Sequence, residues 1–212
     1  MSLVIDNLIQ VKKIINNNNI NIIAVSKSFQ YEQVKPLVET GHKHFGENKV
    51  QEAKNKWLNI RNKIKDIKLH MIGKLQSNKA KEAVSLFDYI HSLDNPKLAS
   101  LLSKFEELLE KKRKYFIQVN IGRESQKGGI KIEQLENFFY YCSRDLKLNV
   151  IGLMAIPPND NNQGLYFKHL MVLNESLGLK ELSIGMSGDF VEAIKYKATF
   201  VRIGSAIFGN RS

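Results

Sequence analysis

Residues 22–27 read Ile22-Ile23-Ala24-Val25-Ser26-Lys27, five apolar or small residues followed by a lysine. An apolar run of this length is typical of a parallel strand that is covered on both faces. Lysine is among the residue types least often found fully buried, so a lysine at the carboxyl end of such a strand either reaches solvent or takes part in chemistry. We favour the second interpretation, in which Lys27 is the amine that holds an aldehyde cofactor.

Seven further short apolar stretches follow this one, each separated from the next by a pattern typical of a helix. The eight predicted strands are residues 22–27, 44–46, 68–72, 88–93, 115–120, 148–154, 181–184 and 199–203. Strands that alternate with helices form a parallel sheet. Eight such units in 212 residues predict one (β/α)₈ barrel, a TIM barrel, as a single domain over residues 1–212. The alternative is an open doubly wound sheet, and the absence of a G-x-G-x-x-G after the first strand counts against it.

The composition indicates a soluble protein of the cytoplasm. Residues 1–13 lack the basic start and long apolar run of a signal peptide, and no apolar run reaches membrane-spanning length. The single cysteine, Cys142, excludes an intramolecular disulfide and fits a reducing compartment. We therefore expect a cytoplasmic location and no membrane partner.

The formal net charge of +11 at pH 7 raises the question of an anionic partner such as nucleic acid. The lysines are spread along the chain, and the densest groups, Lys12-Lys13 and residues 111–114, lie beside helical patterns. Abundant lysine, asparagine and isoleucine indicate a bias in coding composition rather than a binding patch. We expect a solvated basic surface and no nucleic-acid partner.

Two loops carry the residue types of a phosphate site. They follow the seventh and eighth predicted strands, where the phosphate sites of such barrels are often built. Backbone N–H groups without side-chain obstruction, together with hydroxyl donors, suit a phosphate. The loops supply Ser187, Gly188, Gly204 and Ser205. Glycine and serine are also common in ordinary loops and caps, so both interpretations stay open.

An aldehyde that carries a phosphate describes pyridoxal 5'-phosphate. An exposed lysine has a pKa of about 10.4, and an amine partly removed from water near other cations loses its proton more easily and attacks an aldehyde. Arg202 lies on the last predicted strand, the neighbour of the first strand once a barrel closes, so its guanidinium can reach the ring nitrogen of the cofactor. A guanidinium only donates hydrogen bonds, which leaves that nitrogen unprotonated and the ring a weak electron sink. Such a site favours holding the cofactor over decarboxylation or transamination.

Six stretches match a known protein family in the same order and span nearly the whole chain. They are residues 24–27 (AVSK), 45–48 (FGEN), 70–79 (HMIGKLQSNK), 152–157 (GLMAIP), 185–190 (GMSGDF) and 201–209 (VRIGSAIFG). In these stretches the chain resembles the pyridoxal phosphate homeostasis proteins, the YggS/PROSC type. The pattern H-x-I-G-x-L-Q-x-N-K is the most specific of the six.

The resemblance implies a barrel similar to the amino-terminal domain of alanine racemase, without that enzyme's second domain, and a pyridoxal phosphate site. The implied site residues are Lys27, Asn48, Ile72, Ser187, Arg202, Gly204 and Ser205. Lys27 would hold the cofactor as a Schiff base, and Arg202 would face the ring nitrogen. Asn48 and Ile72 would lie beside the ring, and the other three residues would hold the phosphate. Ser205 stands where threonine is also common in the family, a change that keeps the hydroxyl.

The resemblance also implies what the protein does. Members of the family buffer or deliver pyridoxal phosphate and keep vitamin B6 pools balanced, with no established catalysis. We therefore expect a binding protein rather than an enzyme. Its partners would be the cofactor and, transiently, pyridoxal-phosphate-dependent apoenzymes, and the lack of a second domain makes a monomer plausible.

The alternative function is a pyridoxal-phosphate-dependent enzyme resembling an amino-acid racemase. Racemisation on such a barrel needs a second base opposite the lysine, which in alanine racemase is a tyrosine supplied across a dimer by the domain that this chain lacks. No tyrosine stands at a predicted strand end, which favours binding over turnover.

Three further residues leave questions for the structure. Lys127 matches a second family lysine near the site, and it is either an alternative amine for the aldehyde or a solvated loop lysine. His42 and His44 have the spacing of metal ligands on a strand, but no further cluster completes a zinc set. We expect both to be surface histidines.

Overall fold

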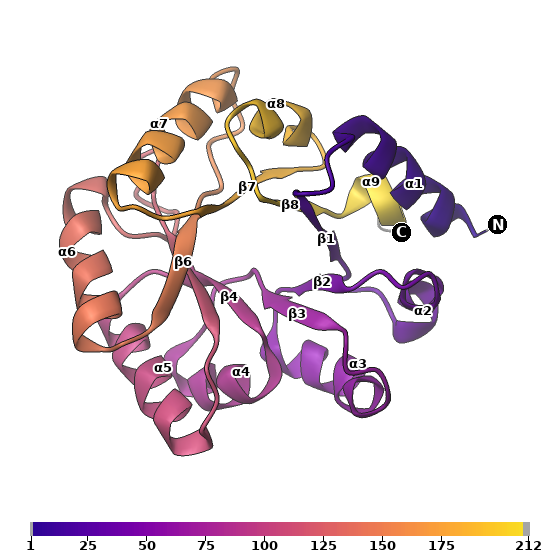
Figure 1. Cartoon of the computed structure of the whole chain (residues 1–212), viewed down its shortest axis with the longest axis horizontal. Helices are drawn as coiled ribbons and strands as arrows, with labels where there is room; N and C mark the ends of the chain where they lie inside the picture. Colours follow the sequence, from indigo (N-terminus) through magenta and orange to yellow (C-terminus); the bar gives the residue numbers. More distant parts are fainter. Residues whose placement is uncertain (1, 210–212) are drawn as a thin grey trace.

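Strand β1 (Asn21–Val25) is hydrogen-bonded on one side to β2 (His44–Glu47) and on the other to β8 (Phe200–Ile203), so the sheet closes on itself. The strands between them are β3 (Lys68–Met71), β4 (Tyr89–Leu93), β5 (Lys114–Gln118), β6 (Asn149–Met154) and β7 (Glu181–Met186). All neighbours are parallel and follow one another in chain order around the barrel. This computed structural model, which describes residues 2–209, confirms the predicted barrel and excludes the open sheet (Figure 1).

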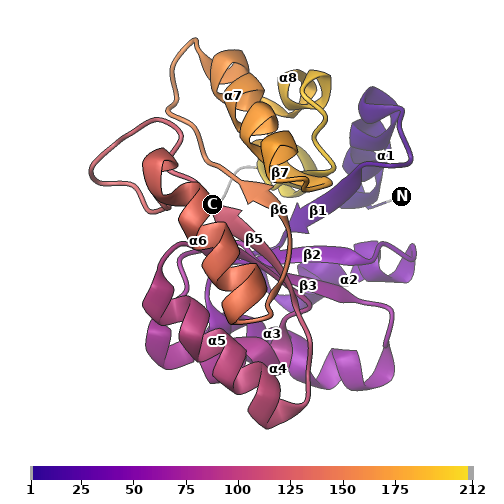
Figure 2. The ribbon, with the colours of Figure 1, turned by 60° about the vertical axis from the view of Figure 1, so that its left-hand side comes forward.

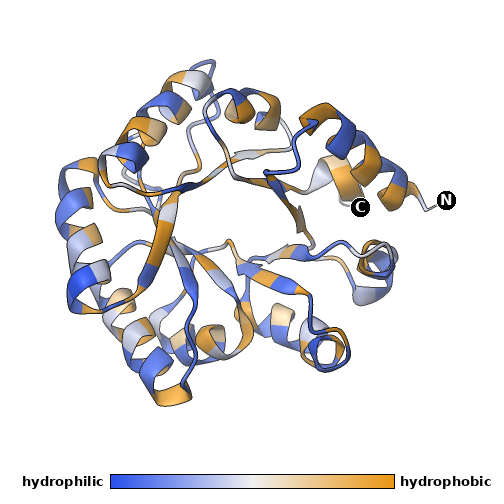
Figure 3. Cartoon of the chain, viewed as in Figure 1, coloured by the Kyte–Doolittle hydropathy of each residue, from blue (hydrophilic) through white to orange (hydrophobic). Residues whose placement is uncertain are grey.

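The helices surround the barrel (Figures 1 and 2). They are α1 (Leu3–Ile15), α2 (Tyr31–Glu39), α3 (Val50–Lys63), α4 (Ala80–Leu86), α5 (Pro96–Leu109), α6 (Leu135–Tyr140), α7 (Gln163–Ser176), α8 (Phe190–Lys195) and α9 (Ser205–Phe208). Figure 3 shows hydrophobic residues along the strands and alternating with hydrophilic ones along the helices, as expected for helices that bury one face. No helix within residues 2–209 has the length and apolar character needed to cross a membrane.

Helix α5 shows how the sequence builds these elements. The side chain of Asn95 accepts a hydrogen bond from the N–H of Leu98 at 2.9 Å, and Pro96 occupies the first turn, where no N–H is needed. Leu98 and Leu102, one turn apart, are fully buried against the barrel. The Asn95 cap and the row of buried leucines therefore both specify this helix.

All eight predicted strands are present, with ends shifted by at most two residues, and two features of the carboxyl face concern the site. Strand β1 ends at Val25, so Lys27 belongs to the following turn rather than to the strand. The loop after β8 continues directly into the short helix α9, which begins at Ser205. A helix of this length leaves too few residues for a periodic pattern, so the sequence did not predict it.

The interior of the barrel holds a column of hydrogen-bonded polar side chains. The imidazole Nδ1 of His44 lies 2.9 Å from Nε2 of His70, and Nδ1 of His70 lies 2.9 Å from Nε2 of His91. His91 Nδ1 in turn lies 2.9 Å from the hydroxyl of Ser183. The column is packed inside a cluster of apolar side chains: Ile23, Tyr89, Phe116, Met154 and Phe200.

The prediction that His42 and His44 are surface histidines is wrong. Both residues are half-buried, His42 packed against Phe45 and with its Nε2 donating to the carbonyl of His44 at 3.0 Å. Burial is the main cause that lowers the pKa of each from 6.5 to about 4. Within residues 2–209 no group of three or more His, Cys, Asp or Glu side chains could hold a metal ion.

These two histidines, together with the fully buried His70 and His91, predict that the fold loses stability in mild acid. Burial, the largest cause, also lowers the pKa of His70 and His91 well below 6.5. Below about pH 6.5 the unfolded chain therefore binds more protons than the folded one, and stability falls as the pH drops from about 6.5 toward the folded-state pKa values. Each such histidine contributes up to about 1.4 kcal/mol per pH unit. We expect the free energy of urea unfolding to fall by at least about 2 kcal/mol between pH 7.5 and pH 5.5.

The matched variants are His70→Gln, which removes a buried histidine, and His169→Gln, which removes an exposed one. The first should reduce the pH dependence of the unfolding free energy and the second should leave it unchanged. Equal pH dependence in the unmodified protein and both variants would show that the buried histidines do not cause the loss of stability in acid.

Candidate functional site

The carboxyl ends of the strands enclose a cavity of about 520 Å³. All seven residues of the predicted site line it: Lys27, Asn48, Ile72, Ser187, Arg202, Gly204 and Ser205. They come from the segments that follow β1, β2, β3 and β7 and from β8 and its loop. Residues far apart in the sequence thus meet at one end of the barrel, as expected where parallel strands all end on the same face.

Lys27 is held by a tight turn. The N–H of Phe29 donates to the carbonyl of Ser26 at 3.2 Å, so Lys27 and Ser28 are the two central residues. Ser28 has a φ of 67°, the left-handed conformation that some tight turns require. The N–H of Ser26 donates to the carbonyl of Gly46 on β2 at 3.0 Å, which anchors the turn to the sheet. The turn therefore fixes the backbone of Lys27, whose half-buried side chain lines the cavity.

Arg202 is almost completely buried, and protein acceptors hold its guanidinium in one orientation. Nη1 donates to the carbonyl and to the hydroxyl of Ser183, both at 2.7 Å, and Nη2 donates to the carbonyl of Ala155 at 2.8 Å. Burial lowers the pKa of Arg202 to about 10, so it is charged at neutral pH. Three of the five N–H donors of a guanidinium are thereby engaged. Two donors remain for a ligand in the cavity that Arg202 lines.

Ser187 joins the two loops that were predicted to hold a phosphate. Its hydroxyl accepts hydrogen bonds from the N–H groups of Gly204 at 3.1 Å and Ala206 at 3.2 Å. A Cβ added at Gly204 would meet no atom closer than 3.6 Å, and one at Gly188 would meet nothing within 4 Å. The protein itself leaves the space beside both glycines open, which is the arrangement that a group bound close to the backbone requires.

Close packing of glycines positions Asn48 and Ile72. A Cβ at Gly73 would lie 2.4 Å from the carbonyl oxygen of Asn48, so only glycine allows these two loops to approach. A Cβ at Gly46 would lie 3.0 Å from Cδ1 of Ile72, so the missing side chain makes room for that isoleucine at the cavity.

The model of the alanine racemase amino-terminal domain family matches residues 2–212. A protein of Aquifex aeolicus named pyridoxal phosphate homeostasis protein is 36% identical over 203 residues, which cover 92% of this chain and 88% of the relative. A protein of the same name from Schizosaccharomyces pombe is 35% identical over 213 residues, 95% of this chain and 89% of the relative. The chain belongs to the pyridoxal phosphate homeostasis proteins.

Solved structures agree with this membership. PipY of Synechococcus elongatus, solved with pyridoxal phosphate bound, is 31% identical and superposes with a TM-score of 0.89 over 98% of this chain and all of that one. Alanine racemase of Bartonella henselae shares only 13% identity, with a TM-score of 0.78 over 60% of its own chain. The second likeness shows that this family member shares the racemase barrel fold.

The sequence analysis did not predict a buried ion pair, Glu47 with Lys56, that contacts the residue before Lys27. The carboxylate of Glu47, at the end of β2, accepts hydrogen bonds at Oε1 from Ser26 at 2.7 Å and Trp57 at 2.9 Å. Lys56 of α3 lies 2.8 Å from the same oxygen and donates to the carbonyl of Ser26 at 2.6 Å. The network ties the residue before Lys27 to β2 and α3. Its members are polar residues with no shared periodicity, so the sequence offered no signal that joins them.

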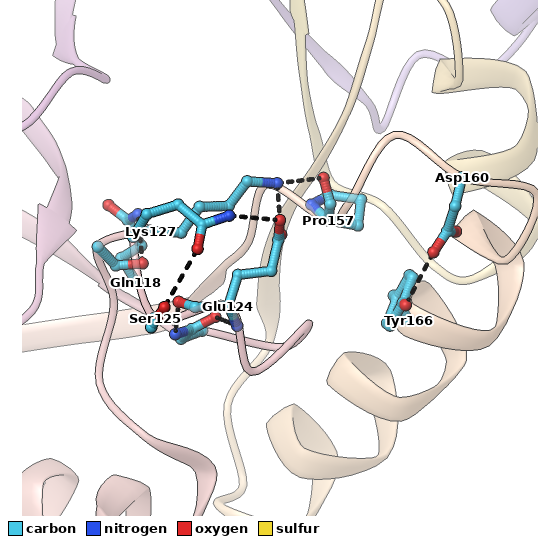
Figure 4. A network of polar contacts seen from close by, with 10 residues as sticks. Gln118, Glu124, Ser125, Lys127, Pro157, Asp160 and Tyr166 are labelled. Atoms are coloured by element: carbon cyan, nitrogen blue, oxygen red, sulfur yellow. Dashed lines mark hydrogen bonds and ion pairs between the residues drawn. The ribbon is translucent and has the colours of Figure 1, made fainter.

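Lys127 is anchored outside the cavity lining. Its Nζ lies 2.6 Å from Oε2 of Glu124 and donates to the carbonyl of Pro157 at 3.2 Å (Figure 4). These contacts join the loop after β5 to the segment after β6. Lys127 is thus not a freely solvated loop lysine, and it would have to leave the ion pair with Glu124 to act as an alternative amine.

We predict that Lys56→Met lowers the free energy of unfolding by about 3 kcal/mol, because it leaves the carboxylate of Glu47 buried without its cation. The matched control is Lys54→Met on the same helix, which removes a more exposed ion pair with Glu82 and should cost less than about 1 kcal/mol. Urea unfolding of the three proteins at pH 7.5 measures both changes. Equal costs for the two variants would show that the Glu47 network does not stabilise the fold.

Proposed function

We propose that this protein binds pyridoxal 5'-phosphate through Lys27 and buffers or delivers it in the cell, as part of vitamin B6 homeostasis. The observation that carries the proposal is the convergence of all seven predicted residues on one cavity. Its support from relatives is PipY, 31% identical over nearly the whole chain and solved with pyridoxal phosphate bound.

The residues present fit this cofactor. Val25, Ile72 and Met186 give the cavity an apolar wall suited to a flat ring. Lys27 and Arg202 supply positive charge for an anionic ligand. When bound, pyridoxal phosphate supplies an aldehyde that condenses with an amine with loss of water.

Each group then has a defined task. Lys27 presents the amine from its anchored turn, and Arg202 offers its two remaining donors to the ring nitrogen. The Ser187 hydroxyl and the backbone N–H groups of Gly188 and Ser205 offer donors to the phosphate, and the missing side chain of Gly204 leaves room for it.

Binding without turnover is the function that these side chains support. A guanidinium only donates hydrogen bonds, so it leaves the ring nitrogen unprotonated. An unprotonated ring is a weak electron sink. Among the described residues, none of those lining the cavity is a tyrosine that could serve as the second base of a racemase. Racemisation of any amino acid that disappears in Lys27→Ala would establish the racemase-like alternative. Contact with apoenzymes, a monomeric state, a cytoplasmic location and the absence of a nucleic-acid partner stay predictions.

We predict that borohydride reduction of the protein loaded with pyridoxal phosphate places a pyridoxyl group on the peptide that contains Lys27. Visible absorption before reduction and peptide mass mapping after it measure the result. Lys27→Ala should lose the adduct, and Lys127→Ala, the matched loop control, should keep it. An adduct that persists in Lys27→Ala would identify another lysine as the amine.

Arg202→Ala should weaken retention of pyridoxal phosphate by about ten-fold or more, the effect of losing a hydrogen bond from a charged donor. Dialysis of the loaded protein, followed by absorption, measures retention. Arg123→Ala is the control, because Arg123 is exposed and pairs with Glu133 outside the cavity. Unchanged retention in Arg202→Ala would show that this residue does not face the ring.

A further inference from the structure

The orientation of Arg202 depends on Ser183, which accepts two of its three hydrogen bonds. A hydroxyl has one proton to donate and two lone pairs to accept. Because a guanidinium only donates, the Ser183 hydroxyl must accept from Arg202. Among the residues that the structure describes, the other partner of this hydroxyl is Nδ1 of His91. The hydroxyl proton is therefore satisfied only if Ser183 donates it to His91.

This single constraint assigns the tautomers of the whole column. A neutral imidazole has one donor nitrogen and one acceptor nitrogen. If His91 accepts at Nδ1, its proton is on Nε2 and is donated to Nδ1 of His70. His70 then carries its proton on Nε2 and donates it to Nδ1 of His44. Every hydrogen bond in the column points away from Arg202.

The packing keeps the rings neutral and fixed. His70 and His91 are fully buried and stack on Tyr89 and Phe116, with ring centroids 4.3 Å apart in both pairs. Burial is the first cause of the low pKa values of both, and the positive charge of Arg202 lowers the pKa of His91 further. A protonated imidazole has no acceptor nitrogen, so neutrality is the condition for the column to exist.

The column ends at the opposite face of the barrel from the cavity. His44 is the first residue of β2 and borders a separate hollow of about 310 Å³ together with Lys43 and Asn21. The charged groups that act on its ring are Lys68, Asp88, Lys43 and Lys114, from β3, the segment before β4, the segment before β2, and β5. The hydrogen bonds thus run from the amino-terminal face to the arginine of the candidate site.

We propose that His44, His70, His91 and Ser183 form a one-directional hydrogen-bond relay that holds Arg202 in the orientation needed to donate to a ligand's ring nitrogen. They are positioning residues, since they act on the ligand through Arg202. The tautomer assignment stands on the protein's own contacts, and the effect on a ring nitrogen rests on the proposed binding of pyridoxal phosphate.

The first test needs no cofactor. Nitrogen-15 NMR of the imidazole rings in the protein without added ligand distinguishes the two tautomers of each histidine. We expect His44, His70 and His91 to carry their protons on Nε2, with exposed His169 as the internal reference for a solvated ring. In Ser183→Ala the preference of His91 for this tautomer should weaken, because its donor is lost. A proton on Nδ1 of His91 in the unmodified chain would overturn the relay.

The second test uses protein loaded with pyridoxal phosphate labelled with nitrogen-15 in its ring. Ser183→Ala and His91→Leu should move the ring-nitrogen resonance toward that of the free cofactor and weaken retention by about ten-fold. His91→Asn, which keeps an acceptor near the position of Nδ1, should restore part of the shift, and His169→Gln should change nothing.

The outcomes separate the two proposals. If the unmodified protein forms no borohydride adduct, the proposed function fails while the tautomers still test the relay. If the adduct forms and the nitrogen-15 resonance of the ring is the same in Ser183→Ala as in the unmodified protein, the relay does not position Arg202 and the inference fails.

Discussion

The pairing of β8 with β1 is the contact on which the rest of this structure depends. The register sets Arg202 opposite Ile23 and Ile203 opposite Ala24, so the last strand ends beside the first. Lys27 follows one of these strands and the serine and glycine loop follows the other. Closing the sheet is therefore the same event as assembling an amine, a guanidinium and open backbone donors around one cavity. An open sheet from the same strands would leave these groups on opposite edges.

The interior solves the problem of burying polar groups in two different ways. Glu47 and Lys56 bury opposite charges, with Ser26 and Trp57 donating to the same carboxylate oxygen. The histidine column instead stays neutral and pairs each donor with an acceptor. The column avoids the cost of an unpaired buried polar group, about 1 to 3 kcal/mol each, whereas Oε2 of Glu47 has no hydrogen-bond partner among the described residues. The first arrangement ends at Ser26, the residue before Lys27, and the second ends at Arg202, which lines the cavity.

The cavity is surrounded by groups that the protein itself holds in place, as the binding role proposed above requires. The lysine is presented from a hydrogen-bonded turn, and the guanidinium is held by three protein acceptors. Fixed groups bind well because little freedom is lost on binding. No tyrosine is among the described residues that line the cavity, and Lys27 is the one lysine among them.

The sequence by itself determined the alternation of eight strands and helices, and with it the barrel, because apolar periodicity is a local property. The seven residues at its carboxyl face were implied by the resemblance of six sequence stretches to a known family. The sequence did not determine which side chains meet inside. His44, His70, His91 and Ser183 lie on four strands, and His91 and Ser183 are 92 positions apart. Only the register between strands, decided when the sheet closes, turns them toward one another. For the same reason the sequence did not show that His44 joins the interior column: without further metal ligands, His42 and His44 were expected at the surface, whereas the tertiary structure half-buries both.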